Sequence, residues 1–200
     1  TKILENFPLK NNQKIKSEYE LNYPEIQENK RIIYPNNCNE FSRNIFSFFN
    51  SAPFLQFLEG LTSISGLISD SYFNGGGFHE ISKGGKLGIH ADFRINEQLH
   101  LYRRLNVLIY LNEEWNHESG LLRLLRNPKD IEDYFLEIPA SIGSMVAFKV
   151  DQNCWHGYRP FEGKRLSIQL NYLYQGFLSR HNTRHKLSAL FKKILNIFKK

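Results

Sequence analysis

Cysteine is scarce in this chain, with Cys38 and Cys154 the two examples in 200 residues. Small secreted domains that lack a large core depend on several disulfides, so this count favours a reducing compartment such as the cytoplasm. No apolar run approaches the roughly 20 residues that a membrane-spanning helix requires. The first residues, TKILENFPLKNNQKIK, contain no apolar segment typical of a secretory signal peptide. The sequence does not begin with methionine, so a preceding targeting segment stays open.

Acidic residues are absent from the C-terminal stretch 177–200, which carries seven Lys and Arg residues. The net charge of +6 therefore belongs to this tail, and the rest of the chain is close to neutral. The segment KLSALFKKILNIFKK has apolar residues at helical spacing and predicts a basic amphipathic helix. It could contact an anionic membrane surface, but packing on the core or on a second copy is the simpler expectation. Nucleic-acid binding is not expected, because the basic residues have little aromatic interleaving.

Hydrophobic residues make up 41% of the chain, enough for one compact domain. We expect helical support in residues 1–70, a β core in residues 71–178 and the basic tail in residues 179–200. Within the first part, the stretch 1–36 is polar and irregular. Helices are expected from Glu40 and after Ser51, the second with apolar residues facing inward. Those inward residues are Phe54, Leu55, Phe57, Leu58 and Leu61.

After Ser71, glycines punctuate short runs that are rich in β-branched and aromatic residues. Such short strands at regular spacing predict a mainly β sandwich or barrel. The expected strands are 78–82, 87–92, 104–111, 121–125, 135–138, 144–148 and 165–174.

The tripeptide His90-Ala91-Asp92 lies at the end of an expected strand. Because side chains alternate along a strand, His90 and Asp92 would point to the same face and could reach one ion. His156, in NCWHGYRP, is the best candidate for a third ligand. Two imidazoles and one carboxylate with open coordination positions are typical of non-haem Fe(II).

The other histidines differ in their surroundings. His79 lies on an expected strand and could line a cavity, although we expect a structural hydrogen-bonding role for it. The remaining four lie in polar stretches and receive no metal role: His100, His117, His181 and His185. Cys154 would share a strand face with His156, but a core cysteine is the simpler interpretation.

Several segments follow one another in a characteristic order: GGKLGIHADF, RRLNVLIYLNEEW, SGLLRLL, IPASIGSMVAF and CWHGYRPFEGKRLSIQL. Together they resemble the prolyl 4-hydroxylase-like branch of the 2-oxoglutarate/Fe(II) oxygenase superfamily. The resemblance covers roughly residues 53–175. It implies a double-stranded β-helix of the jelly-roll or cupin type, with the metal site at one mouth. His90, Asp92 and His156 would be the iron ligands and the catalytic centre.

The resemblance also implies how the co-substrate 2-oxoglutarate binds. Arg165, nine residues after His156, would bind the far carboxylate of 2-oxoglutarate bidentately through its planar guanidinium group. Ser167 lies on the same strand face and could add a hydrogen bond. Tyr110 matches a tyrosine that contacts the co-substrate in related enzymes, although a core aromatic is an equal alternative. Fe(II), 2-oxoglutarate and O2 are the implied cofactors, and ascorbate could be used as well.

The implied reaction is hydroxylation of an unactivated C–H bond, with succinate and CO2 as co-products. Asp92 favours this outcome over halogenation, because related halogenases carry a small residue at its position. A prolyl residue in a protein or peptide is the first expectation for the substrate, and a free amino acid, a glycan or another small metabolite are alternatives. The loop 93–103 is a candidate lid. A non-catalytic metal-binding β-barrel is the alternative from another class.

One segment departs from the pattern of bacterial relatives, which carry Gly-Gly-x-Leu-Glu-Leu after the YLN strand. Here Ser119 replaces a turn glycine and Arg123 replaces an acid. Gly120 remains available for a positive φ. Substrate contacts inferred from close relatives do not carry over at these positions.

Overall fold

The computed structural model describes residues 1–8 and 27–176. Its helical elements are α1 (Lys2–Glu5), a 3-10 turn (Pro35–Asn37), α2 (Glu40–Phe49) and α3 (Ala52–Thr62). Its strands are β1 (Gln27–Ile33), β2 (Leu67–Ser69), β3 (Gly77–His90), β4 (Ile95–Asn96), β5 (Leu101–Tyr110), β6 (Leu122–Leu125), β7 (Tyr134–Ile138), β8 (Met145–Lys149), β9 (His156–Tyr158) and β10 (Arg165–Tyr174).

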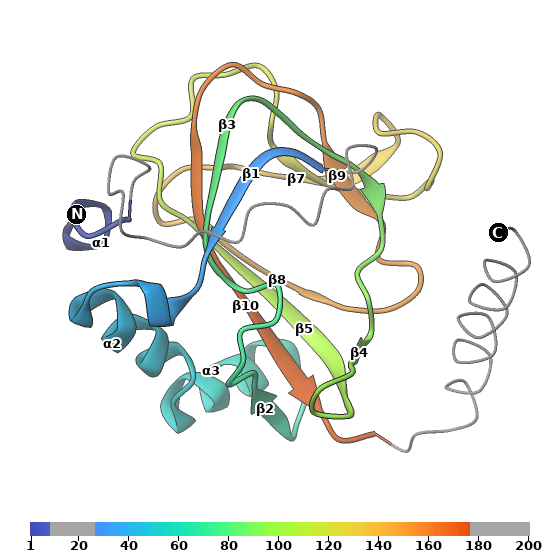
Figure 1. Ribbon diagram of the computed structural model, residues 1–200. Coiled ribbons are helices and arrows are strands. Elements are labelled where there is room, and N and C mark those ends of the chain that lie inside the picture. Colours follow the sequence, from blue (N-terminus) through green and yellow to red (C-terminus); the bar gives the residue numbers. More distant parts are fainter. Residues whose placement is uncertain (9–26, 177–200) are drawn as a thin grey trace, which may run out of the picture.

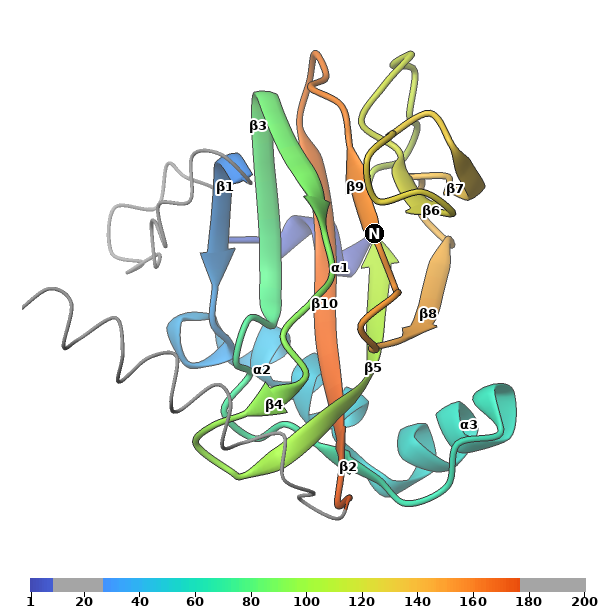
Figure 2. The same cartoon turned by 90° about the vertical axis from the view of Figure 1, so that its right-hand side faces the viewer.

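The strands form one curled antiparallel sheet in the order β4-β5-β10-β3-β9-β6-β7. In addition, β1 pairs with β3, β2 with β10 and β8 with β5. The long strands β3, β5 and β10 stand side by side, and the shorter β6, β7 and β9 gather on one side of them (Figures 1 and 2). The predicted mainly β, double-stranded β-helix architecture is confirmed.

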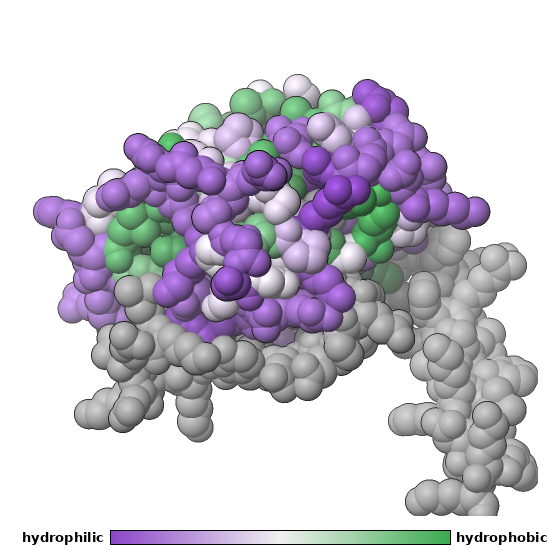
Figure 3. Space-filling view, turned by 90° about the horizontal axis from the view of Figure 1, so that it is seen from above, coloured by the Kyte–Doolittle hydropathy of each residue, from purple (hydrophilic) through white to green (hydrophobic). Residues whose placement is uncertain are grey.

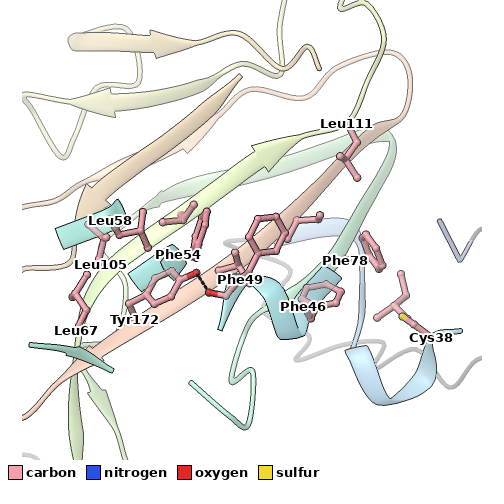
Figure 4. Packing of buried hydrophobic residues seen from close by; sticks show 14 of the residues in the cluster. Cys38, Phe46, Phe49, Phe54, Leu58, Leu67, Phe78, Leu105, Leu111 and Tyr172 are labelled. Atoms are coloured by element: carbon pink, nitrogen blue, oxygen red, sulfur yellow. Dashed lines mark hydrogen bonds between the residues drawn. The ribbon is translucent and has the colours of Figure 1, made fainter. Parts of the chain in front are cut away.

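Helices α2 and α3 lie below the long strands in Figure 1 and close one side of the sheet. The side chain of Asn39 caps α2 by accepting a hydrogen bond from the Ser42 amide, as the start of a helix requires. Phe46 and Phe54 insert from the helices into the apolar cluster against β5 and β10 (Figure 4). The hydroxyl of Tyr172 on β10 also donates a hydrogen bond to a helix carbonyl, at 2.9 Å.

The expected inward face of the second helix is correct for Phe54 and Leu58, which are buried. It is wrong for Phe57 and Leu61, whose exposures are 50% and 56%. The helix packs on the sheet through a narrow stripe, and residues four apart fill that stripe. Apolar residues beside it therefore stay on the surface.

Strand β1 lies in a stretch that we expected to be irregular. Its polar composition makes it hard to recognise, because five of its seven residues carry charged or amide side chains and it is an edge strand paired with β3. The expected strands 78–82 and 87–92 are one long strand, β3, whose pairing with β1 shifts in register between Glu28 and Lys30. Strands β2, β4 and β9 have only two or three residues, too few for a periodic pattern to reveal.

The predicted basic helix of residues 179–200 lies outside the described residues. Within the described part of the chain, no helix has the length and apolar character needed to cross a membrane. The face seen in Figure 3 is mainly hydrophilic, with apolar residues in small separate patches.

Phe46 provides a test of the helix–sheet packing. It is 1% exposed and makes edge-on ring contacts with Phe73 and Phe78. Phe46→Ala is expected to lower the free energy of unfolding by about 3–5 kcal/mol, because it leaves a cavity in the core. Denaturant unfolding measures the effect. Phe48→Ala, at a side chain that is 57% exposed, is the control and is expected to cost far less.

Candidate metal centre and adjoining cavity

The pairing of β3 with β9 brings two of the predicted ligands together. His90 is the last residue of β3, and its direct cross-strand partner is His156, the first residue of β9. Gly157 allows this close approach, because a Cβ at its position would lie 2.8 Å from the carbonyl oxygen of Leu87. Asp92 follows two residues after β3 ends.

The structure brings His90, Asp92 and His156 into one cluster, with one potential ligand atom of each within 4.8 Å of the others. The Nε2 atom of His90 is 3.6 Å from one carboxylate oxygen of Asp92, and that of His156 is 3.8 Å from the other. Ligand atoms that each lie about 2 Å from one ion are separated by about 3 to 4 Å. The spacing therefore suits a single bound cation.

Hydrogen bonds from the backbone set the state of both imidazoles. Nδ1 of His90 lies 2.9 Å from the Gly88 carbonyl oxygen, and Nδ1 of His156 lies 3.0 Å from that of Cys154. In the neutral imidazole each carbonyl accepts a hydrogen bond from Nδ1–H, which leaves Nε2 without a proton and turned to the shared position. Burial lowers the pKa of His156 to about 4, so this imidazole is neutral at pH 7. The donor set fits an Fe(II) site of two imidazoles and one carboxylate.

Asp92 is held by two neighbours that sequence reasoning missed. The Asn106 amide donates a hydrogen bond to Oδ2 of Asp92, and the Arg103 guanidinium lies 3.9 Å from the same oxygen. Burial alone would raise the pKa of Asp92, but the adjacent His90 side chain and the charge of Arg103 outweigh it and hold that pKa below its ordinary value. Asp92 is therefore a carboxylate ready to bind a cation.

His90, Asp92 and His156 line a cavity of about 380 Å³, within the range of small-molecule sites. Arg165 lines the same cavity and is 2% exposed. Its guanidinium donates to the Gly120 carbonyl at 2.7 Å and to the Tyr110 hydroxyl at 3.1 Å, and it lies 4.3 Å from the ring centre of Tyr158. Its Nε–H has no partner among the described residues. A buried cation with an unused donor is suited to a carboxylate.

The other two predicted co-substrate residues take different positions. Ser167 lines the cavity between its cross-strand neighbours Tyr110 and His79. Tyr110 is fully buried and does not line the cavity; its contact is with Arg165. Burial raises the pKa of Tyr110, so its hydroxyl stays neutral beside the guanidinium.

His79 lines the cavity too, with its Nε2 buried and without a hydrogen-bond partner. The structure shows both roles considered for it, the cavity position and a hydrogen bond with the backbone of Gly75. The expected lid segment 93–103 forms a hairpin of β4 and the start of β5. Phe93 and Arg103 from this hairpin border the cavity, with the guanidinium 4.5 Å from the ring centre.

A signal for Asn106 was present in the sequence. It is a polar residue on the same strand face as Leu108 and Tyr110, in the otherwise apolar stretch 105–109, so it needs an inward partner. Lys30, which also lines the cavity, could not be found without first recognising β1.

Comparisons with known proteins agree with this geometry. The family model described as the 2OG-Fe(II) oxygenase superfamily matches residues 76–173, which include all six predicted site residues. The chain belongs to the 2OG-Fe(II) oxygenase superfamily. It is therefore a 2-oxoglutarate-dependent dioxygenase, a class that uses Fe(II), 2-oxoglutarate and O2.

The fold of this oxygenase is also similar to that of solved structures. One is the crystal structure of a Pseudomonas putida prolyl-4-hydroxylase, with 18% sequence identity and a TM-score of 0.53. The alignment covers 78% of this chain and 77% of that one. A search of curated proteins finds no match.

The segment after the YLN strand, in which Ser119 and Arg123 depart from the pattern of bacterial relatives, keeps its strand and its turn glycine in this oxygenase. Gly120 takes a positive φ of 88°, and its carbonyl accepts the bond from Arg165. Arg123 forms ion pairs with Glu132 and Glu137, so the basic residue is matched by acids on the neighbouring turn and strand.

Asn106 tests how Asp92 is positioned. Asn106→Ala removes the donor to Asp92, and partners of metal ligands typically contribute 10- to 100-fold to affinity. We expect Fe(II), or Mn(II) as its substitute, to bind about 10- to 100-fold more weakly in a calorimetric titration. Asn116→Ala, on the surface, is the control. Unchanged metal affinity in a folded Asn106→Ala protein would show that Asp92 needs no such support.

The lowered pKa of His79 predicts that the stability of the fold depends on pH. Burial lowers its pKa well below the ordinary 6.5, so the unfolded chain binds a proton that the folded chain does not. The metal-free protein should therefore lose stability as pH falls below about 6.5. His79→Gln is expected to reduce this slope in unfolding measurements between pH 7 and pH 5, whereas His100→Asn, at an exposed histidine, should leave it unchanged.

Proposed function

We propose that this oxygenase hydroxylates an unactivated C–H bond, with succinate and CO2 as co-products. His90, Asp92 and His156 would hold the iron. Arg165 would bind the far carboxylate of 2-oxoglutarate, with Ser167 beside it. When bound, iron and 2-oxoglutarate supply the activation of O2, one atom of which enters the substrate and the other succinate.

The observation that carries this proposal is the position of Arg165. A buried arginine with an unused Nε–H lies on the wall of the cavity into which the three candidate ligands point. A non-catalytic metal-binding barrel would need no such cation beside its metal. A dicarboxylate that chelates the metal needs a partner for its second carboxylate, and Arg165 is suited to provide it.

Other residues hold Arg165 in position and line the cavity. Tyr110 and the Gly120 carbonyl hold the guanidinium in place through two hydrogen bonds, so it can meet a carboxylate with little loss of freedom. We therefore assign Tyr110 to positioning Arg165. Leu122 and Phe148 add apolar surface to the cavity wall, which strengthens charge interactions within it.

A prolyl residue of a protein or peptide is the first candidate substrate, supported by the fold shared with the Pseudomonas putida prolyl-4-hydroxylase. A free amino acid, a glycan or another small metabolite are the alternatives. Incubation of the Fe(II)-loaded protein with 2-oxoglutarate and each candidate tests them, through succinate formation and a product mass gain of one oxygen atom. We place the reaction in the cytoplasm, because both cysteines are free thiols. Ascorbate could serve as a reductant.

Arg165→Met tests the co-substrate role. It keeps the apolar stem of the side chain but removes the charge and the donors, so 2-oxoglutarate affinity is expected to fall about 100-fold or more. Anaerobic calorimetry with the Mn(II)-loaded protein measures this loss. Mn(II) affinity itself should be unchanged, which separates the two sites.

Arg159→Met is the matched control, because Arg159 is exposed and pairs with Glu132 on the surface. It is expected to bind 2-oxoglutarate as the unaltered protein does. Equal 2-oxoglutarate affinity in Arg165→Met and Arg159→Met would contradict the assignment.

A further inference from the structure

The cavity contains more positive charge than iron and 2-oxoglutarate account for. Among the described residues that line it, Arg103, Arg165 and Lys30 are cations and Asp92 is the one carboxylate. A bound Fe(II) and a 2-oxoglutarate dianion would cancel each other. Two positive charges would then remain in a partly buried site, where charges interact strongly.

Two of the three cations already have partners. Arg103 donates to Asn106 at 2.8 Å and to Asn171, and it lies close to Asp92. Arg165 is assigned to the far carboxylate of 2-oxoglutarate. These two side chains are therefore occupied by the metal ligand and the co-substrate.

Lys30 is different. Among the described residues, its ammonium group makes one hydrogen bond, at 3.2 Å, to the neutral amide of Gln27, and it has three N–H donors to satisfy. The nearby acid Glu80 does not neutralise it, because Glu80 pairs with Arg31 and is adjacent in sequence to His79 and so points to the other face of β3. Burial lowers the pKa of Lys30 to about 8, so the group remains mostly protonated at pH 7, and a bound anion would raise that pKa again.

The strand register separates Lys30 from the 2-oxoglutarate site. Lys30 and Arg165 are cross-strand partners of the same residue, Ile81, on opposite sides of β3. Two strand spacings, about 10 Å, thus separate their backbones. The guanidinium of Arg165 is tied to Tyr110 and Gly120. Tyr110 comes from β5, on the far side of β10 from β1.

His79 lies in the same part of the cavity as Lys30. It is 2% exposed and lies on β3 directly opposite Ile32, which is two residues from Lys30 on β1. Its Nε2 is buried without a partner, a state that native structures rarely leave without a ligand. The backbone of Gly75 accepts a hydrogen bond from the other ring nitrogen of the neutral imidazole, so Nε2 is a hydrogen-bond acceptor.

We propose that the substrate of this oxygenase bears a carboxylate, which Lys30 binds, and an N–H or O–H group, which donates to Nε2 of His79. This inference rests on the proposed function and narrows its substrate class. An acidic peptide and a free carboxylic acid share this chemistry.

The test uses probes that differ by one charge. One pair consists of the α-amides of acetyl-prolyl-glutamate and acetyl-prolyl-glutamine, and the other consists of free acetyl-alanine and acetyl-alaninamide. Each is titrated anaerobically into the full chain saturated with Mn(II) and 2-oxoglutarate. We expect the acidic member of one pair to bind about 10- to 100-fold more tightly than its neutral partner. The pair that shows the difference tells whether the carboxylate comes from a peptide or from a free acid.

Lys30→Met should abolish this preference while leaving 2-oxoglutarate affinity unchanged. Lys83→Met is the matched control, because Lys83 is an exposed lysine that pairs with Glu162, and it should keep the preference. Lys30→Arg retains the charge and should keep most of the preference, which guards against misfolding of the Met variant. His79→Gln should weaken binding of both members of the pair.

Three results would overturn the inference. The first is that neither pair shows a preference. The second is that the preference persists in folded Lys30→Met. The third is that Lys30→Met weakens 2-oxoglutarate binding as strongly as Arg165→Met does. The last result would assign Lys30 to the co-substrate. Failure of the proposed function is distinct from all three, since it appears as 2-oxoglutarate binding that does not depend on Arg165.

Discussion

The site depends on the antiparallel pairing at the end of β3, where His90 and His156 face one another across two strands. Residues 66 positions apart in the chain become neighbours through this register alone. A shift of one residue would turn one imidazole to the opposite face and separate the pair. Gly157 has no side chain and so lets β9 approach the β3 backbone closely. The arrangement of the candidate metal ligands is thus a consequence of sheet geometry, and the helices support it from a distance.

A second constraint is the neutralisation of buried charge. Asp92 is surrounded by an amide, a guanidinium and two imidazoles, which stabilise it as a carboxylate in a buried place. Arg165 and Lys30 lack a comparable acidic partner within the described residues. The cavity therefore favours anions at two positions, one on β10 and one on β1. This asymmetry connects the fold with a reaction that consumes a dicarboxylate and, as we infer, a carboxylate-bearing substrate.

Much of this was predictable from sequence, for identifiable reasons. The β core and the helix from Glu40 follow from periodicity, and the three candidate ligands follow from residue types with a known preference for metals. Lys30 could not be predicted, because β1 is a polar edge strand whose existence depends on pairing with β3. The exposure of Phe57 and Leu61 was equally hidden, since it depends on how much of α3 the sheet covers. The position of Tyr110 behind Arg165 depends on side-chain packing, which strand alternation alone cannot distinguish from direct contact.

The central claim is that His90, Asp92 and His156 hold one Fe(II) to which 2-oxoglutarate can bind. A keto acid that chelates Fe(II) produces a visible charge-transfer absorption, which can be recorded anaerobically by adding 2-oxoglutarate to the Fe(II)-loaded protein. We expect this absorption in the unaltered chain and its loss in His156→Ala, with the fold retained as judged by circular dichroism. An absorption of equal strength in both proteins, or none in the unaltered one, would contradict the account.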